Sequence, residues 1–297
     1  MTATAWLVLY SALIVMGSVA GGYLPLLGRV THSRLQLYLS ASAGVMLGAS
    51  FFHVMPEAID RTGTVGFGWW MSLGVVGLFC IERFIAPHSH EIDGGGHHDH
   101  AGAHHHDHEH HEHQHDQPVA AVKEPRAAAP AVAGWMAVLG LTIHTFMNGF
   151  GLAGAVEAGL STHTVLPGFA LFLAIVLHKP ADALAISTVL SRKGVSRRKL
   201  LLVQYCFAAM IPVGAAAFVL AQEVIEDRLK DQLTGAALAF SAGTFLFIAL
   251  SDLLPEVQFH RHDRIPLFLA LVLGVVFMGG IAYLEPHEEP ATKTSKK

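Results

Sequence analysis

The sequence predicts an all-α protein that crosses a membrane about eight times, with an inverted repeat relating the first three helices to the last three. Three observations support this fold class. Apolar residues make up 52% of the 297-residue chain and charged residues only 14%. The apolar residues fall in long uninterrupted runs, which a water-soluble core does not require. Two of these runs, 199 residues apart, also share a pattern of residues.

A bilayer core requires about 20 consecutive apolar residues per helix. The stretches of that length are 4–27, 35–58, 64–86, 131–157, 165–190, 200–221, 233–255 and 265–284. The first has no basic segment before it and is longer than the apolar part of a secretory signal, so we interpret it as a helix. The predicted divisions are helices 1–3 in residues 1–86, a polar loop in 87–130, helices 4 and 5 in 131–190, and helices 6–8 with a short tail in 191–297.

The distribution of Lys and Arg predicts the orientation, because basic residues in short loops stay on the cytoplasmic side. Twelve fall on the face that includes the 87–130 loop and six on the other face; Lys179, within the fifth span, completes the total of 19. We therefore expect a multi-pass protein of the plasma or bacterial inner membrane, with both termini outside and the loop in the cytoplasm. Cys80 and Cys206 each lie in a predicted span, which indicates neither a disulfide nor a thiolate zinc site.

The 87–130 loop is rich in histidine, with thirteen of the chain's 21 histidines between His88 and His115. Its composition cannot bury a core, so we predict disorder and a metal-buffering role; the alternative is a solvated linker. Residues 111–115 formally match the H-E-x-x-H metalloprotease pattern, but a His/Glu repeat produces such a match by chance. The metal-binding candidates in the loop are His97, His98, His100, His104, His105, His106, His108, His110, His111, His113 and His115.

The repeat relates the second and seventh spans. Each contains Ser-Ala-Gly, at 42–44 and at 241–243, followed by Pro-Glu, at 56–57 and at 255–256. Under the predicted topology the two spans run in opposite directions, as in the inverted repeats of many transporters. The metal-capable side chains of these segments are His53 and Glu57, near the outer face, and Asp252 and Glu256, near the inner face. Alternatively, Pro-Glu merely ends each helix.

Ionisable residues in the fourth and fifth spans indicate a metal site. Such a residue costs about 2.5 kcal/mol or more at the bilayer centre and is a functional candidate by default. His144 precedes Asn148 by four residues, and His178 precedes Asp182 by four, so each pair projects from one helical face. Two imidazoles, a carboxylate and an amide carbonyl form a credible site for zinc or a similar ion.

Two neighbours, Thr145 and Lys179, lie beside the predicted ligands. A cation at Lys179 should repel a second metal ion and favour a single one. Its side chain can pair with Asp182, pair with a carboxylate on another helix, or be neutral as a result of burial.

These residues favour a metal importer without covalent chemistry, with the divalent ion as substrate and no catalytic cofactor. The sequence contains no phosphate-binding glycine loop that would couple ATP, and it indicates no nucleotide or nucleic-acid partner. Three alternatives remain at this point: an exporter loaded by the same loop, an intramembrane metalloenzyme with Asp182 as its base, and a metal sensor that does not transport.

With these motifs in view, the chain resembles the ZIP (Zrt-/Irt-like) family of metal transporters. His144, Asn148 and Gly149 match the first, fifth and sixth positions of the family's H-N-x-x-(D/E)-G motif, and the F-F-H-V-M-P-E run at 51–57 is also similar. In the fifth span His178 and Asp182 fall on ligand positions, with the proline displaced by one residue. The sequence departs from the family in Asn148 and Lys179, which replace acids, in Thr145, which replaces asparagine, and in Ile211-Pro212, where many members have Glu-Pro.

The resemblance implies uptake into the cytoplasm, foremost of Zn²⁺ and also of Fe²⁺, Mn²⁺, Co²⁺ or Cd²⁺. It implies a homodimer and an elevator movement in which helices 1, 4, 5 and 6 carry metal against the other helices. All of the departures except Asn148 fall on the second of the family's two metal positions, so the resemblance implies a single-metal transporter here.

Overall fold

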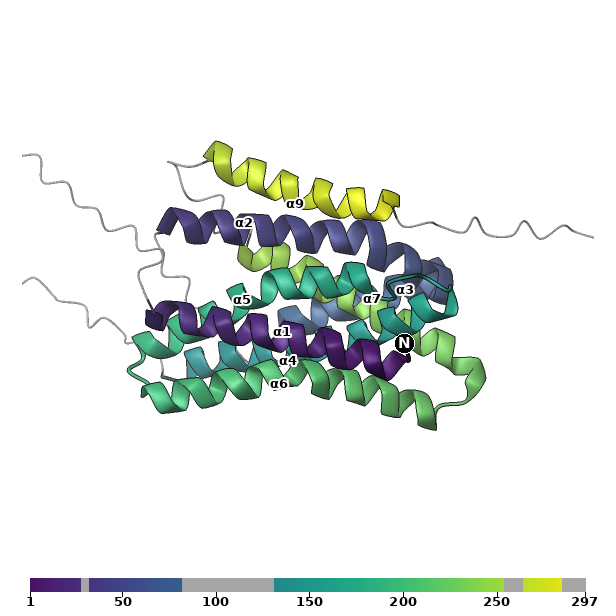
Figure 1. The fold of residues 1–297 in the computed structure, drawn as a ribbon, viewed down its shortest axis with the longest axis horizontal. Helices are drawn as coiled ribbons and strands as arrows, with labels where there is room; N and C mark the ends of the chain where they lie inside the picture. The colour runs from purple at the N-terminus through teal and green to yellow at the C-terminus, as the bar shows by residue number, and fades with distance from the viewer. Residues whose placement is uncertain (28–31, 82–130, 254–263, 285–297) are drawn as a thin grey trace, which may run out of the picture.

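The computed structural model describes residues 1–27, 32–81, 131–253 and 264–284, and within these ranges the chain forms helices and turns with no strand. The elements are α1 (Ala3–Leu27), α2 (His32–Ala49), the π-helix η1 (Ser50–Val54), α3 (Met55–Cys80), α4 (Ala131–Ser161), α5 (Phe169–Arg192), α6 (Arg197–Val224), α7 (Asp227–Ile248), the π-helix η3 (Ala249–Leu253) and α9 (Arg264–Leu284). They lie side by side in one elongated bundle (Figure 1). The predicted all-α membrane fold is confirmed.

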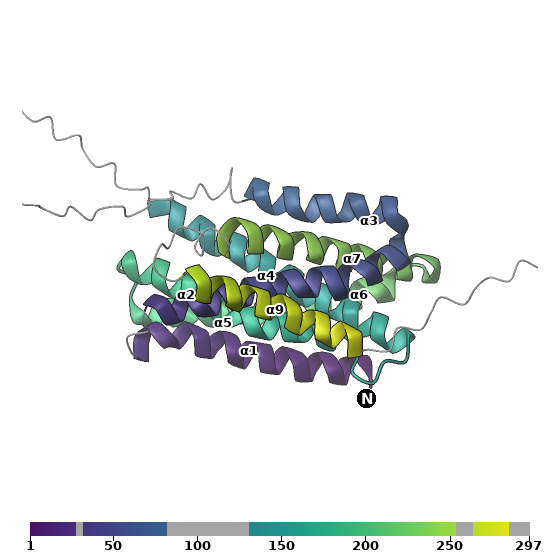
Figure 2. The ribbon, with the colours of Figure 1, turned by 90° about the horizontal axis from the view of Figure 1, so that it is seen from above.

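Six helical segments among the described residues are long and apolar enough to cross a membrane. One of them, Ser33–Cys80, has 48 residues and would be about 72 Å long if straight, more than twice the thickness of a bilayer core. Gly63 interrupts it with φ 69° and ψ 166°, a conformation that only glycine adopts readily. The chain turns back there (Figure 2), in the gap between the predicted spans 35–58 and 64–86. The number of eight helices stays a prediction.

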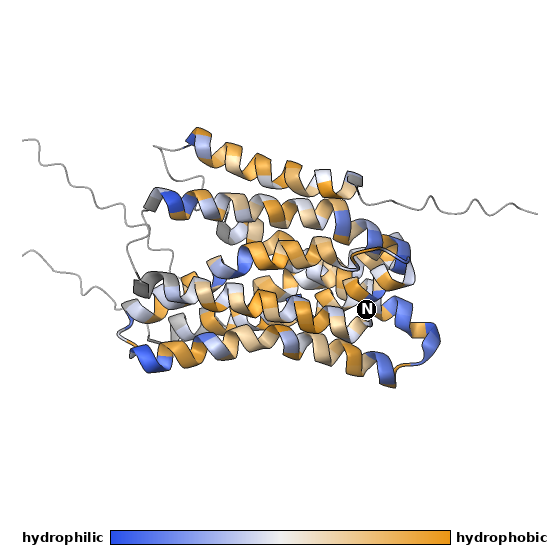
Figure 3. Cartoon of the chain, viewed as in Figure 1, coloured by the Kyte–Doolittle hydropathy of each residue, from blue (hydrophilic) through white to orange (hydrophobic). Residues whose placement is uncertain are grey.

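The ends of the helices gather at two opposite ends of the bundle. The beginning of α1 and the end of α9 lie at one of them (Figure 1), whereas the end of α3 and the beginning of α4 lie at the other (Figure 2). Hydrophilic residues concentrate at these two ends, and apolar residues cover the helices between them (Figure 3). Trp69 on α3 and Leu273 on α9 are 76% and 69% exposed, as expected for side chains that face lipid.

The helices pack in four close pairs: α1 with α5, α2 with α9, α3 with α7, and α4 with α6. Glycines allow the backbones to approach each other in these pairs. A Cβ added to Gly44 of α2 would overlap the Leu271 carbonyl of α9, and one added to Gly274 would lie 2.6 Å from a carbonyl of α2. In the α3–α7 pair, Gly74 and Gly243 pack in the same manner. In both pairs, therefore, the backbones of the two helices are in direct contact at glycines.

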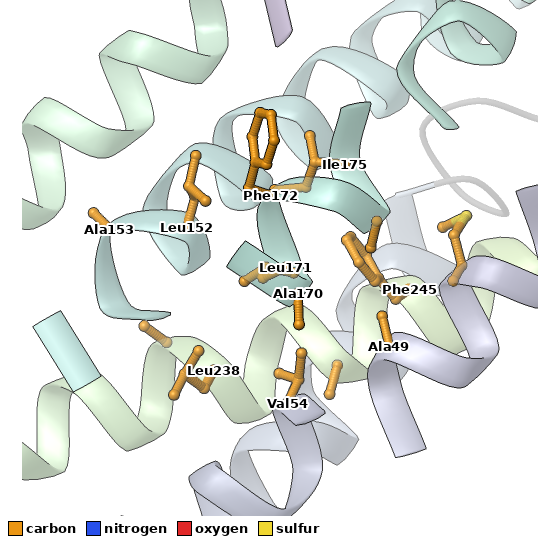
Figure 4. Packing of buried hydrophobic residues seen from close by; sticks show 14 of the residues in the cluster. Ala49, Val54, Leu152, Ala153, Ala170, Leu171, Phe172, Ile175, Leu238 and Phe245 are labelled. Atoms are coloured by element: carbon orange, nitrogen blue, oxygen red, sulfur yellow. The ribbon is translucent and has the colours of Figure 1, made fainter. Parts of the chain in front are cut away.

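The buried core lies where α4, α5, α7 and η1 meet. Leu152 of α4, Phe172 of α5 and Phe245 of α7 are buried there, together with Val54 of η1 (Figure 4). Helix α5 contacts α4 and η1 in this region, and α1 and α2 on its other sides. The core therefore surrounds the segments of α4 and α5 that carry the predicted ligands and excludes water from them.

The two π-helices lie at equivalent positions of the predicted repeat. η1 begins at Ser50 and η3 at Ala249, which is the same separation of 199 residues found in the sequence pattern. π-Helical turns are rare and occur mostly as single turns, often at functional sites. The glycine pairs add to this likeness, because Gly44 with Gly274 and Gly243 with Gly74 join two pairs of helices in the same way. These features support the predicted repeat.

The packing predicts opposite effects for two glycines of α3. Replacing Gly74 by Ala places a methyl group against the Phe240 carbonyl, so we expect the free energy of unfolding to fall by about 1–3 kcal/mol. Replacing Gly77 by Ala is the control, because nothing lies within 4 Å of its added Cβ and alanine favours a helix. Thermal unfolding in detergent measures both. Equal melting temperatures for the two variants would contradict the described α3–α7 contact.

Candidate metal centre

The four predicted ligands come together between α4 and α5. His144 and Asn148 project from one face of α4, and His178 and Asp182 from one face of α5, because residues four apart share a helical face. One ligand atom each of His144, His178 and Asp182 lie within 4.8 Å of one another. All four residues are at most 8% exposed.

Hydrogen bonds orient the two imidazole rings. His178 Nδ1 lies 2.7 Å from the Ala174 carbonyl oxygen, which can only accept, so Nδ1 carries the ring's hydrogen and Nε2 carries a lone pair. The amide nitrogen of Asn148 lies 2.9 Å from His144 Nε2 and 3.3 Å from His178 Nε2. The Nε2 atoms of both rings therefore point toward the same position.

Lys179 is fully buried beside this cluster. Its Nζ donates to Asp182 Oδ2 at 2.7 Å and to the Thr145 hydroxyl at 2.9 Å. It also lies 5.2 Å from the centre of the Phe207 ring. The first of the three predicted possibilities, pairing with Asp182, is confirmed. This ion pair leaves Asp182 Oδ2 only 3.7 Å from His178 Nε2, within reach of a shared ion.

Aromatic and glycine contacts enclose the cluster. The ring of Phe245 on α7 lies 5.2 Å from that of His178 and 5.9 Å from that of His144, measured between ring centres. Gly149, next to Asn148, packs against the backbone of Ile211 on α6, and a Cβ on Gly21 of α1 would overlap Pro180. The backbone is therefore closely packed at both Gly149 and Pro180. The candidate centre between α4 and α5 is therefore enclosed by α1, α6 and α7 as well.

The chemistry of the donor set fits a borderline divalent cation. Two neutral imidazole nitrogens, one carboxylate oxygen and one amide oxygen are ligands that zinc accepts in tetrahedral geometry. Ligands at about 2.0–2.1 Å from zinc lie roughly 3.3 Å apart, so the ligand atoms described above need to approach each other by only a small amount. Asn148 Oδ1 and His144 Nδ1 are buried atoms without a hydrogen-bond partner among the described residues.

Of the predicted pathway residues, His53 and Glu57 have described contacts, and these are with residues other than the four ligands. His53, in η1, has its Nε2 3.0 Å from the Met278 carbonyl oxygen of α9. Glu57 accepts from Arg61 at 2.7 Å. The Asp252 side chain, Glu256 and the loop histidines between residues 97 and 115 lie outside the described residues.

Sequence reasoning missed the role of Arg61. Its guanidinium pairs with Glu57 and with Asp231 of α7, and it donates to the Ser161 hydroxyl of α4 at 2.9 Å. It thus ties the end of α4 to α3 and α7. The spacing of Glu57 and Arg61, four residues apart on a helix, was the available signal for one of these contacts. The contacts with Asp231 and Ser161 had no signal in the sequence.

A second contact that the sequence did not predict joins α2 to α5 beside the site. The Tyr38 hydroxyl donates to the Leu177 carbonyl oxygen, and the Ser42 hydroxyl donates to the same oxygen at 3.4 Å. Leu177 directly precedes His178. Tyr38 is a polar residue inside the predicted span 35–58, which makes it unusual. The sequence does not identify its partner.

Comparison with known proteins matches these features to one family. The model of the ZIP zinc transporter family matches residues 3–282. The zinc transporter ZIP9 of Micropogonias undulatus is 26% identical over 271 residues, which cover 86% of each chain. The ZIP13 homologue of Drosophila melanogaster is 24% identical over 288 residues, covering 85% of this chain and 79% of its own. Human zinc transporter ZIP4 is 25% identical over 288 residues, covering 84% of this chain and 43% of its own. A match over nearly the whole chain means that this protein belongs to the ZIP family of zinc transporters, membrane proteins that transport metal.

Proposed function

We propose that this protein is a secondary transporter that carries Zn²⁺, or a similar divalent ion, into the cytoplasm through one site between α4 and α5. The observation that carries the proposal is the buried cluster of His144, His178 and Asp182. Buried imidazoles and a carboxylate are costly in a membrane helix bundle, and such residues mark the pathways of ions and polar substrates. Both rings present Nε2 to one position, which is the arrangement that a bound cation requires.

The bound cargo is a single ion. Lys179 Nζ occupies the space between Asp182 and Thr145, so a positive charge already stands where a second ion would need ligands. The remaining ligands for one ion are His144, Asn148, His178 and Asp182. A metal approaching Asp182 competes with the ammonium group for the same carboxylate and leaves no free carboxylate for another ion.

The route begins at the end of the bundle where α1 begins and α9 ends (Figure 1). Capture occurs near His53 and Glu57, where the half-buried carboxylate of Glu57, paired with Arg61, attracts divalent ions from outside. After coordination at the centre the ion leaves toward Asp252, Glu256 and the histidine-rich loop. This order places the termini outside the cell and the loop in the cytoplasm of a multi-pass protein of the plasma or inner membrane.

Alternating access requires two bodies that move relative to each other. The pairs α1–α5 and α4–α6 pack around the site, whereas α2–α9 and α3–α7 form the other pairs. An elevator movement of the first four helices against the second four, in a homodimer, follows the same division. The matching π-helices and glycine pairs support an inverted repeat within the second group. The Tyr38–Leu177 contact joins the two bodies in the described state.

Zinc uptake into proteoliposomes tests the function and its direction. With zinc outside and a fluorescent zinc indicator inside, we expect time-dependent filling of the vesicles by the reconstituted protein. Protein orientation is determined by protease access to an epitope in the 87–130 loop, and uptake is compared between the two orientations. A metalloenzyme or a sensor gives no flux above empty liposomes. Filling only through molecules whose loop faces the outside would indicate an exporter.

A further inference from the structure

The amide of Asn148 lies between the two imidazole rings of the centre. Its side chain is fully buried, and its nitrogen lies 2.9 Å from His144 Nε2 and 3.3 Å from His178 Nε2. Its oxygen has no hydrogen-bond partner among the described residues. The nitrogen rather than the oxygen of this amide thus occupies the position toward which the two rings point.

The orientation of the amide follows from the tautomer of His178. Because Nδ1 of this ring must donate to the Ala174 carbonyl, Nε2 of the neutral ring can only accept. The atom opposite Nε2 must therefore be a donor, which the amide nitrogen is and the amide oxygen is not. An amide nitrogen has two hydrogens, one for each imidazole, so His144 Nε2 accepts as well.

Two imidazole lone pairs that converge on one atom define a cation position. We infer that the amide nitrogen of Asn148 fills the cargo position before metal binds, and that metal binding turns the amide so that Oδ1 replaces it as a ligand. This inference rests on the proposed function of the same centre. Rotation by half a turn about the last side-chain bond exchanges the two atoms and needs no movement of α4.

A carboxylate at position 148 cannot perform this role. An ionised carboxylate has no hydrogen to donate, so it would place its lone pairs opposite those of the two rings in the empty site. Phe245 packs over both rings, so little water is available to separate these groups. The amide therefore stabilises the empty site and weakens metal binding, because binding must first break the two hydrogen bonds.

Exchange of the amide for an acid tests the inference. For purified Asn148→Asp in detergent we expect Zn²⁺ to bind about tenfold or more tightly than to the parent protein, by isothermal titration calorimetry. We also expect a lower melting temperature in EDTA, so that zinc raises the melting temperature by more than it does in the parent. Asn148→Ala removes both donor and ligand, and should lower both the melting temperature in EDTA and the zinc affinity.

Gln204 offers a matched control for the amide-to-acid exchange. It is a buried amide that donates to the Ala183 carbonyl at 2.6 Å and to the Ser187 hydroxyl at 2.8 Å, apart from the four ligands. Gln204→Glu should lower the melting temperature and leave the zinc affinity unchanged. A tenfold gain in zinc affinity in this variant as well would overturn the inference, since any added buried charge would then suffice.

Two further results for Asn148→Asp would contradict the inference. An Asn148→Asp protein that binds zinc no more tightly than the parent, or melts at the parent's temperature in EDTA, overturns the inference. If Asn148→Asp does not fold, ¹⁵N NMR of the zinc-free parent decides: hydrogen on Nδ1 of His144 and His178 supports the inference, and hydrogen on either Nε2 overturns it. Zinc binding by the parent that does not depend on His178 would instead contradict the proposed function.

Discussion

Zinc uptake by His178→Ala is expected to fall to the level of empty liposomes. His178 has several contacts in the candidate centre, because its Nε2 faces Asn148 and Asp182 and its ring packs against Phe245. The alanine variant loses one imidazole ligand and leaves Asn148 with a single acceptor. Uptake into proteoliposomes and zinc binding in detergent should therefore disappear together.

Deletion of residues 88–116 is the matched comparison for this variant. It removes all thirteen loop histidines between His88 and His115, but leaves the helical centre intact. We expect most of the uptake to remain, because under the proposed mechanism the ion is coordinated by the helical centre and the loop only buffers metal after release. If the deletion stops uptake and His178→Ala does not, the transport site is elsewhere.

Replacement of Lys179 by Asp is expected to raise the bound metal from about one to about two zinc ions per chain. The ammonium group now neutralises Asp182 from 2.7 Å and fills the space beside Thr145. The variant removes this cation and adds a carboxylate in the same place. Two unpaired carboxylates then need cations, and zinc supplies them.

The measurement is equilibrium dialysis followed by elemental analysis, with zinc present throughout so that the buried acids are never left without a counter-ion. Lys179→Met is the control, because it removes the cation without adding a ligand and should keep one zinc ion. A ratio that stays at one in the aspartate variant would show that Lys179 does not stand at a second metal position.

The sequence predicted the features that depend on a single helix. The spacing of His144 and Asn148, and of His178 and Asp182, determines the helical face of each pair once the helices exist. The pairing of Lys179 with Asp182 is likewise local, three residues apart. Boundaries were less accurate: α6 (Arg197–Val224) is longer at both ends than the predicted span 200–221, because polar end turns remain helical beyond the apolar run.

Features that join distant helices could not be predicted. Arg61 meets Asp231 across 170 positions, and His53 meets the Met278 carbonyl across 225. Periodicity gives the direction of a side chain from its own helix axis, but not the helix that lies in that direction. The choice of the amide nitrogen of Asn148 as the inward atom depends on the Ala174 carbonyl and two rings together, which no spacing encodes.

The buried pair of Lys179 and Asp182 has an electrical consequence under the proposed mechanism. Their opposite charges cancel, and with neutral imidazoles and a neutral amide the empty centre has no net charge, whereas the loaded centre has the two charges of its cargo. A membrane potential contributes about 2.3 kcal/mol per charge for each 100 mV, so it acts on the loaded crossing. The unloaded return involves no electrical work. An interior-negative voltage therefore accelerates the inward step of this carrier and leaves its resetting step unaffected.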